Sequence, residues 1–348
     1  MALPKTLLVT NKTNIRYFSG FTGTSGYLAL NGKRGFLFTD ARYHLVAKSV
    51  LPKNFVVIDI TGGFEKSWKI FLQKERVRQL GIEGGDMTLQ FWKYLKKISK
   101  NTKIVDIGDE LSKRRMIKKP FELANIERAQ KITDAILDIL RRWLKSGVSE
   151  HEIDWKIESL AHELGADDIS FPPIVGINEN SASPHHQNSH KKLKKGDMIL
   201  IDMGVIYKGY CSDMTRVLFT KKPTAEQTKI YELVKEAQIS AEKKLKAGVS
   251  GKNGDTWARS VIEKAGFGKY FGHSLGHGVG LDIHELPNLS QKYTGKIPEG
   301  SVVTIEPGIY LPGKFGVRLE DMVLVQKNGV RNLTRSPKAI QEVTIRLE

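Results

Sequence analysis

Four acidic residues in the C-terminal part of the chain stand where charged side chains are unusual. Asp202 ends the apolar stretch MILI, and Asp213 follows it after a Tyr-Lys-Gly-Tyr turn. Glu306 likewise ends the apolar stretch VVTI, and Glu320 follows it after a Pro-Gly-Lys turn. Burying like charges at such positions costs several kcal/mol each unless cations compensate them. The four carboxylates therefore predict a shared metal cluster.

The turn residues predict how the two acids of each pair face one another. If the first turn is centred on residues 207 and 208, Asp202 lies directly opposite Asp213, whereas a turn one residue later makes them diagonal neighbours. With Gly313 at the centre of the second turn, the two glutamates lie opposite each other. In each case both carboxylates of a pair share one face of their hairpin.

The alternative explanation is that an arginine in the sheet neutralises each acid. Arg216 and Arg318 lie close to the acids in the sequence and could do so. This structural explanation is the simpler one for any single acid. For four acids on two similar hairpins, bound cations are the simpler compensation.

A glycine-rich stretch, GHSLGHGVGLDIHE at 272–285, supplies nitrogen ligands. It contains His273, His277 and His284, and its glycines indicate a closely approached backbone rather than a helix. Four carboxylates with the His277 imidazole suit two divalent ions, Mn, Co or Zn rather than Cu, about 3.5–4 Å apart. Such a pair lowers the pKa of a water molecule and polarises a carbonyl, so the predicted chemistry is metal-assisted hydrolysis.

An internal repeat links the two hairpins. Lys-Ser-Gly-Val-Ser at 145–149 recurs as Lys-Ala-Gly-Val-Ser at 246–250, and GDMILIDMG at 196–204 corresponds to GSVVTIEPG at 300–308. Each copy is predicted to contain a helix, a glycine-marked turn, a second helix and a strand. The acids that end the two strands are then counterparts in a pseudo-twofold arrangement.

The elements that position these residues predict two domains. Strands are predicted at 6–10, 26–30, 35–40 and 55–60, and a helix at 89–98. They make residues 1–115 a smaller α/β domain, and the charged segment SKRRMIKKP at 112–120 marks its end. An amphipathic helix over 122–144 then opens the second domain, residues 116–348, which contains the repeat and is of the α+β class.

Composition narrows the possible partners and locations. The chain has 348 residues and a formal net charge of +17, but no aromatic stacking motif accompanies the scattered basic residues. The sequence therefore predicts a basic surface and no nucleic-acid partner. Cys211 is the single cysteine, which excludes an internal disulfide and a zinc site built on paired cysteines. No apolar stretch approaches the about 18 residues of a membrane span, so a cytoplasmic protein without membrane contact is expected.

The order and context of the five ligand candidates resemble those of the pita-bread metallopeptidases. The contexts are IDMG, CSDMTR, HSLGHGVGLDIHE, TIEPGIY and VRLED. They are most similar to the proline-peptidase branch, which contains Xaa-Pro aminopeptidases and Xaa-Pro dipeptidases. NIRYFSGFTGTSGYLAL and LFTDARY, within residues 14–43, resemble the N-terminal domain of the same branch. The resemblance thus implies a C-terminal pita-bread domain preceded by a creatinase-like α/β domain.

The resemblance also implies a role for each ligand. Asp202 would chelate the first ion, His277 and Glu306 would hold the second, and Asp213 with Glu320 would bridge both. Glu306 would in addition move a proton to and from the attacking water.

Four further residues receive roles by the same resemblance. His185, in SASPHH, would lie beside the metals, whereas its neighbour His186 is expected at the surface. His273 and His284 would contact the substrate or stabilise the tetrahedral intermediate. Arg318 would orient the ligand carboxylates.

The implied activity is removal of an N-terminal residue that precedes proline, by a homodimer. The alternative within the family is an Xaa-Pro dipeptidase. Some family dipeptidases have an arginine after their HExP segment, whereas HELP is followed here by Asn288, which favours longer peptides. Methionine aminopeptidases lack the N-terminal domain. Metal-free creatinases and non-enzymatic binding modules of this fold typically lose ligands, and all five are present here.

Overall fold

The computed structural model describes residues 3–347. The chain divides into two compact units, with the division between Arg115 and Met116. Each unit has its own strands, helices and buried core. None of the helices in the described part of the chain combines the length and the apolar composition of a membrane span.

Six strands of the first unit form one mixed sheet. Their bounds are β1 Thr6–Val9, β2 Tyr27–Asn31, β3 Arg34–Thr39, β4 Phe55–Asp59, β5 Gln79–Ile82 and β6 Lys103–Asp106. The sheet order is β4-β3-β2-β1-β5-β6, in which β2 is antiparallel to both neighbours and the other pairs are parallel. The four strands predicted from the apolar stretches are confirmed.

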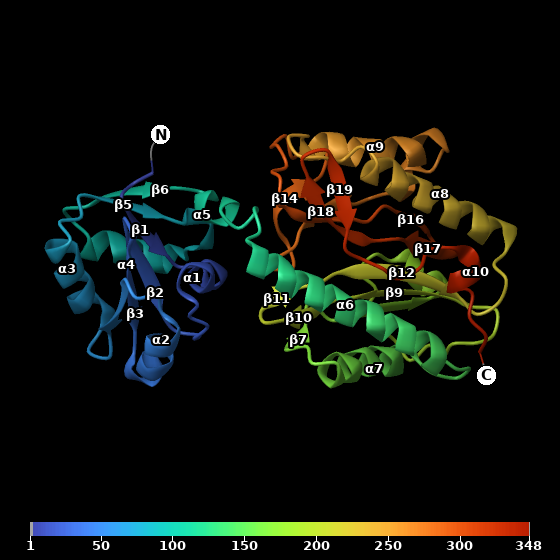
Figure 1. Cartoon of the computed structure of the whole chain (residues 1–348), viewed down its shortest axis with the longest axis horizontal. Coiled ribbons are helices and arrows are strands. Elements are labelled where there is room, and N and C mark those ends of the chain that lie inside the picture. Colours follow the sequence, from blue (N-terminus) through green and yellow to red (C-terminus); the bar gives the residue numbers. More distant parts are fainter. Residues whose placement is uncertain (1–2, 348) are drawn as a thin grey trace. The chain divides into compact units, whose positions relative to one another are not determined.

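Helices cover both faces of this sheet. They are α1 Lys12–Ser19, α2 His44–Val50, α3 Phe64–Lys74, α4 Leu89–Ile98 and α5 Glu110–Lys113. Trp68 of α3 and Leu95 of α4 are fully buried against one face, and Ile15 of α1 and Ala47 of α2 against the other (Figure 1). Successive side chains of β1 alternate between these two cores, as the pleat of a strand requires. The helix predicted over 89–98 is confirmed as α4.

The second unit contains short sheets between two pairs of long helices. Its helices are α6 Pro120–Trp143, α7 Glu150–Glu163, α8 Ala225–Glu242, α9 Gly251–Lys264 and α10 Ile340–Val343. Its strands are β7 Asp168–Ile169, β8 Ile174–Ile177, β9 Met198–Met203, β10 Val205–Tyr207, β11 Tyr210–Cys211, β12 Met214–Phe219, β13 Gly276–Gly278, β14 Glu285–Leu289, β15 Val302–Ile305, β16 Gly308–Leu311, β17 Phe315–Arg318, β18 Asp321–Gln326 and β19 Gly329–Asn332. Helix α6 begins two residues earlier than predicted, because Pro120 suits a first helical turn whose N–H groups have no helical partner.

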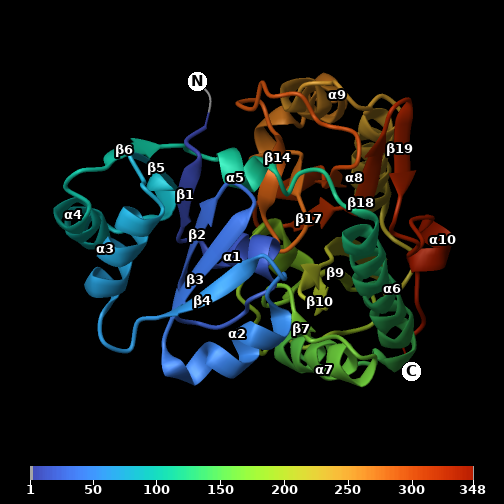
Figure 2. The ribbon, with the colours of Figure 1, turned by 60° about the vertical axis from the view of Figure 1, so that its left-hand side comes forward.

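Matching contacts confirm the internal repeat. Gly147 and Gly248 precede α7 and α9, have φ angles of 95° and 83°, and donate backbone hydrogen bonds to Leu193 and Ile297 at 2.8 and 2.9 Å. Figures 1 and 2 show α7 and α9 on opposite sides of the strands. One continuous hydrophobic core contains side chains from α6, α8, β9 and β15 and so joins both repeats. The repeat therefore brings the ends of β9 and β15, with their acids, to the middle of the unit.

A buried network of charges joins β12, β18, α8 and the C-terminal segment. Arg216 donates to Asp321 at 2.6 Å, and both side chains are fully buried. Lys338 donates to the second oxygen of Asp321 and lies 3.8 Å from Glu242 at the end of α8. Arg216 also donates to the backbone oxygen of Glu320 at 2.6 Å. The network thus supports the backbone of a residue that the sequence predicts to be a metal ligand.

Glu242→Gln is expected to stabilise the protein at pH 8 and not near pH 4.5. Burial raises the pKa of Glu242 from 4.5 to about 7, with Asp321 acting in the same direction and Lys338 and Arg216 against it. Because the folded state binds the Glu242 proton more tightly than the unfolded state, this group contributes its full stability below pH 4.5. That contribution is lost as the pH rises through about 7. A neutral glutamine does not lose it, so the variant should gain about 1–3 kcal/mol at pH 8. Denaturant unfolding at both pH values checks this, and a difference that does not change with pH would contradict it.

Candidate metal centre

The first predicted pair of acids lies on a hairpin whose turn fixes them as diagonal neighbours. β9 pairs with β12 so that Asp202 lies opposite Thr215 rather than Asp213. The turn residues are Lys208 and Gly209, with φ angles of 48° and 79°. A two-residue type I′ turn requires two positive φ angles and favours glycine at the second position. Direct opposition is therefore wrong, and the diagonal arrangement is confirmed.

The second predicted pair has the expected register. β16 pairs with β17 about Gly313, which has a φ angle of 70°, and β15 pairs with β18 in the same register. Glu306 and Glu320 lie opposite each other in the gap between these two strand pairs. Since they belong to neither ladder, their backbone can bend and direct both carboxylates toward the first hairpin.

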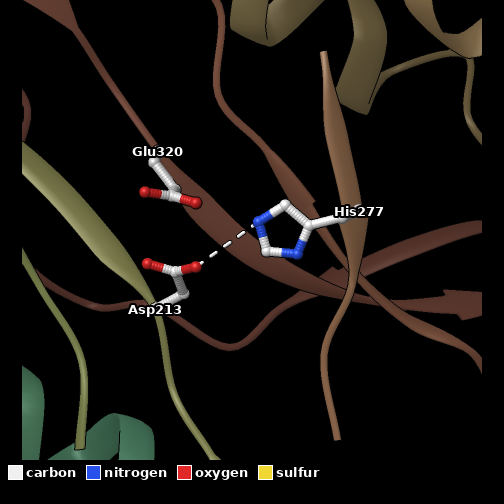
Figure 3. Close-up of side chains that lie close together, drawn as sticks. All are labelled: Asp213, His277 and Glu320. Carbon is white, nitrogen blue, oxygen red and sulfur yellow. Dashed lines mark ion pairs between the residues drawn. The ribbon is translucent and has the colours of Figure 1, made fainter. Parts of the chain in front are cut away.

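His277, on β13, faces acids of both hairpins. Its Nε2 lies 3.5 Å from Oδ2 of Asp213 and 3.4 Å from Oε1 of Glu306. Its Nδ1 lies 3.1 Å from the backbone oxygen of Gly278, which assigns the proton to Nδ1 and leaves the Nε2 lone pair toward the acids. One ligand atom each of Asp213, His277 and Glu320 lie within 4.8 Å of one another (Figure 3). Burial lowers the pKa of His277 to about 3, so the imidazole is neutral.

The carboxylates carry the energetic penalty expected of buried like charges. Burial raises the pKa values of Asp213 and Glu320 well above the usual range, and repulsion from the other acids raises them further. Burial raises the pKa of Glu306 to about 8, although Arg318 acts in the opposite direction. Without a bound cation the protein would therefore retain protons on this cluster at neutral pH.

Arginine neutralises only one of the four acids. Arg318 donates to Oδ2 of Asp202 at 2.5 Å, as the alternative explanation from the sequence requires for that residue. Arg216 instead pairs with Asp321. Within residues 3–347, no lysine or arginine forms an ion pair with Asp213, Glu306 or Glu320. Arginine therefore pairs directly with one acid, and the charge of Arg318 only partly offsets the raised pKa values of the other three.

The donor set fits divalent metal. Oδ1 of Asp202 is buried and has no hydrogen-bond partner among the described residues, so it is available as a ligand. Four carboxylates and one neutral imidazole make the oxygen-rich set that hard or borderline divalent ions prefer. Bound cations would also offset the repulsion between the acids.

Tyr310 is a residue of the site that the sequence analysis missed. Its hydroxyl accepts from Arg318 at 2.8 Å and donates to Nε2 of His273 at 2.9 Å. Nδ1 of His273 lies 2.8 Å from the backbone oxygen of Ser274, so both ring nitrogens are engaged within the protein. Burial lowers the pKa of His273 to about 4. The sequence holds no separate signal for Tyr310, since Gly316 opposite it is required first by the backbone oxygen of Ser181, which would lie 2.1 Å from a Cβ there.

All the candidate site residues line a single cavity of about 520 Å³ in the second unit. The structure brings together the nine residues Asp202, Asp213, His277, Glu306, Glu320, His185, His273, His284 and Arg318. The ring of His284 packs edge to face on that of His277, with 4.3 Å between the ring centroids. Burial lowers the pKa of His284. Phe171, Pro172, Ile174 and Pro184 add an apolar wall, and Asn288 adds a neutral polar side chain. The cavity thus joins the acidic cluster to an apolar wall.

Family models match both units. A model described as metallopeptidase family M24 matches residues 124–327, and one described as the creatinase/prolidase N-terminal domain matches residues 5–117. Two curated relatives are Xaa-Pro dipeptidases. That of Pyrococcus horikoshii is 35% identical over 335 residues, covering 96% of this chain and 93% of the relative. That of Pyrococcus furiosus is 36% identical over 337 residues, covering 96% and 94%.

Solved structures of two bacterial proteins have the same fold over nearly their whole length. An X-Pro aminopeptidase from Thermotoga maritima superimposes with a TM-score of 0.89 at 34% identity, covering 97% of each chain. An Xaa-Pro dipeptidase from Bacillus anthracis superimposes with a TM-score of 0.94 at 34% identity, covering 98% of this chain and 95% of the other. The similar proteins therefore include both an aminopeptidase and dipeptidases.

Proposed function

The chain belongs to metallopeptidase family M24, and from this premise we propose that it removes the N-terminal residue from peptides in which proline is the second residue. It is a metal-dependent Xaa-Pro peptidase with a pita-bread domain. The observation that carries the proposal is the convergence of four carboxylates and one neutral imidazole on a cavity with an apolar wall. The free amine of the substrate would lie near the acidic cluster, which explains cleavage at the N-terminus.

The proposed cofactor is a pair of divalent ions of Mn, Co or Zn. Asp202 would chelate one ion, His277 and Glu306 the other, and Asp213 with Glu320 would bridge them. Bound divalent ions lower the pKa of water and polarise a carbonyl group. Glu306 would accept a proton from the attacking water and deliver it to the leaving proline nitrogen.

Residues around the acids are assigned to the substrate. His185, His273 and His284 line the cavity and are proposed to contact the substrate or stabilise the tetrahedral intermediate. Because both nitrogens of His273 are already hydrogen-bonded, a substrate group would have to replace one of these bonds. Arg318 would orient Asp202, to which it is bonded. The proline ring, which has no amide N–H to offer, would be recognised by the apolar wall of Phe171 and its neighbours.

The charges of the cavity lining bear on the length of the preferred peptide. A dipeptide places its carboxylate beside the proline, where a cation would bind it strongly. Asn288 is neutral, and the one arginine among the cavity-lining residues is bound to Asp202. We therefore propose that longer peptides are preferred over dipeptides. A second candidate function is the Xaa-Pro dipeptidase activity, which the names of the Pyrococcus relatives favour.

Hydrolysis assays on peptides of matched sequence test the proposal. Purified protein loaded with Mn, Co or Zn is expected to cleave Ala-Pro-Ala-Ala between residues one and two. Its kcat/KM for Ala-Pro should be lower by a factor of about ten or more, because the dipeptide carboxylate lacks a charged contact. Chelation should remove both activities, and added metal should restore them. Faster cleavage of Ala-Pro would establish the dipeptidase instead. No turnover with any of the three metals would disprove the peptidase proposal.

The remaining proposals concern assembly and location. We propose a homodimer that works in the cytoplasm, and the presence of a single cysteine in the sequence, Cys211, supports a reducing location. Light scattering of the purified protein measures the assembly directly, and fractionation of the source cells measures the location.

A further inference from the structure

Glu150, the first residue of α7, is a buried carboxylate outside the metal cluster. Its Oε1 accepts from the backbone N–H of Ile177 at 2.8 Å and from Nδ2 of Asn180 at 2.9 Å. Its Oε2 accepts from Nε2 of His186 at 2.9 Å, and from the N–H and hydroxyl of Ser189 at 2.9 and 2.6 Å. All five donors belong to the segment 177–189, which leads from β8 toward β9. One side chain thus holds both ends of this segment.

This segment carries His185 to the cavity wall. Among the described residues nothing hydrogen-bonds to the His185 ring, so its position depends on its own backbone. The next residue, His186, is expected from the sequence at the surface, and that expectation is wrong. Its side chain is only 16% exposed and is bonded to Glu150. The bond from His186 therefore fixes the backbone immediately beside His185.

The second repeat approaches another residue of the cavity lining at the equivalent helix start. The counterpart of Glu150 is Gly251, the first residue of α9. A Cβ on Gly251 would lie 2.0 Å from the backbone oxygen of Asn288, another cavity residue. In both repeats the first turn of the helix therefore holds a segment that lines the cavity, by a buried carboxylate in one and by direct backbone approach in the other.

We infer that Glu150 is a positioning residue of the active site, which acts through His186 and the segment 177–189 to place His185 at the substrate. This inference rests on the proposed function, since it assigns a working partner to a residue of that site. The position of Glu150 in the first turn of α7 also favours an anionic side chain, because the helix dipole is positive at the N-terminal end. All five partners act as donors. A glutamine at position 150 would place its NH2 group, which is also a donor, next to at least one N–H of the segment, so that one hydrogen bond would be lost.

Glu150→Gln is expected to lower kcat/KM for an Xaa-Pro tetrapeptide by about 10- to 100-fold, as small displacements of a reacting group do. In the His185→Ala background the same change should cost less than about twofold, because the two residues act as one unit. Hydrogen exchange of the backbone amides of 177–189 should become faster, with the metal content unchanged. The matched control is Glu152→Gln, which is in the same helical turn and whose carboxylate accepts hydrogen bonds from Ser149 instead of from the segment 177–189. It should retain wild-type kcat/KM.

A pair of substitutions at position 186 covers the case in which Glu150→Gln does not fold. His186→Leu removes one donor to Glu150 and should lower kcat/KM about tenfold, whereas His186→Gln keeps an N–H donor and should restore it. The inference would be overturned if His186→Leu and His186→Gln had equal activity, or if Glu150→Gln had wild-type kcat/KM. It would also be overturned if Glu150→Gln lost as much activity in the His185→Ala background as in the wild type, or if the amides of 177–189 exchanged at an unchanged rate. If the wild type cleaves no Xaa-Pro peptide, the proposed function fails, and the exchange measurement alone still decides whether Glu150 holds the segment.

Discussion

Asp213→Asn is expected to lower kcat/KM for an Xaa-Pro tetrapeptide by about 10⁴-fold, the size of loss typical when a group at the reaction centre is removed. Asp213 lies on the first hairpin, its Oδ2 is 3.5 Å from Nε2 of His277, and its side chain faces Glu320 of the second hairpin (Figure 3). An amide of the same shape cannot supply the negative charge that a bridging ligand needs. Metal analysis of the purified variant should show a reduced metal content, measured beside its activity.

The same substitution should stabilise the metal-free protein at neutral pH. Burial and the neighbouring acids raise the pKa of Asp213, which means that its charged form is disfavoured in the folded state. Asparagine removes this penalty. Thermal unfolding after chelation should therefore give a higher melting temperature for Asp213→Asn than for the wild type, and the order should reverse when metal is added.

Asp138→Asn is the matched control, because Asp138 is exposed on α6 and lies 3.6 Å from Arg141. Its activity and melting temperature should equal those of the wild type. Full activity of Asp213→Asn, or a lower melting temperature in the metal-free state, would contradict the assignment of Asp213 to a metal cluster.

Arg216→Met is expected to lower the free energy of unfolding by about 3–5 kcal/mol. The fully buried guanidinium bonds to Asp321 and to the backbone oxygens of Glu320 and Ser336. Methionine has a similar length but leaves the Asp321 carboxylate with Lys338 and Asn332 alone. Arg216 and Lys338 together hold the pKa of Asp321 at about 2 against the effect of burial, so the loss of Arg216 exposes part of the cost of the buried charge. Denaturant unfolding measures the change.

Arg331→Met provides the comparison, because Arg331 pairs with Glu127 at the surface. Exposed pairs contribute about 0–1 kcal/mol, so this variant should unfold close to the wild type. Adding Asp321→Asn to Arg216→Met should recover part of the lost stability, since the unpaired charge is then removed. If Arg216→Met costs no more than Arg331→Met, the network does not stabilise the fold.

Local patterns in the sequence were sufficient for several of the elements and for one of the two hairpins. Helix α4 has the predicted bounds because its apolar spacing and its Thr88 cap act within a few residues. The register of Glu306 and Glu320 followed from Gly313, because a short turn determines which residues face each other. The repeat was visible because both copies need glycine at the same turns.

The first hairpin shows where such reasoning depends on a detail. A shift of the turn by one residue changes Asp202 and Asp213 from direct to diagonal neighbours, and glycine at position 209 decides between them. The candidate ligands themselves were identifiable, because buried acids on paired strands need compensation. The sequence suggested that His277 lies near these acids but could not establish it, since β13 is separate from both hairpins in the sequence.

The sequence by itself determined several of the elements, the repeat and the residue types that could hold metal, because these depend on interactions between near neighbours in the chain. Only the tertiary structure decided that Arg318 binds Asp202, that Tyr310 engages His273, and that Glu150 holds the segment with His186. The last of these bonds joins residues 36 positions apart, and the first joins residues 116 apart. A hydrogen bond of this kind depends on where two packed elements bring their side chains, and no periodicity within either element records that position.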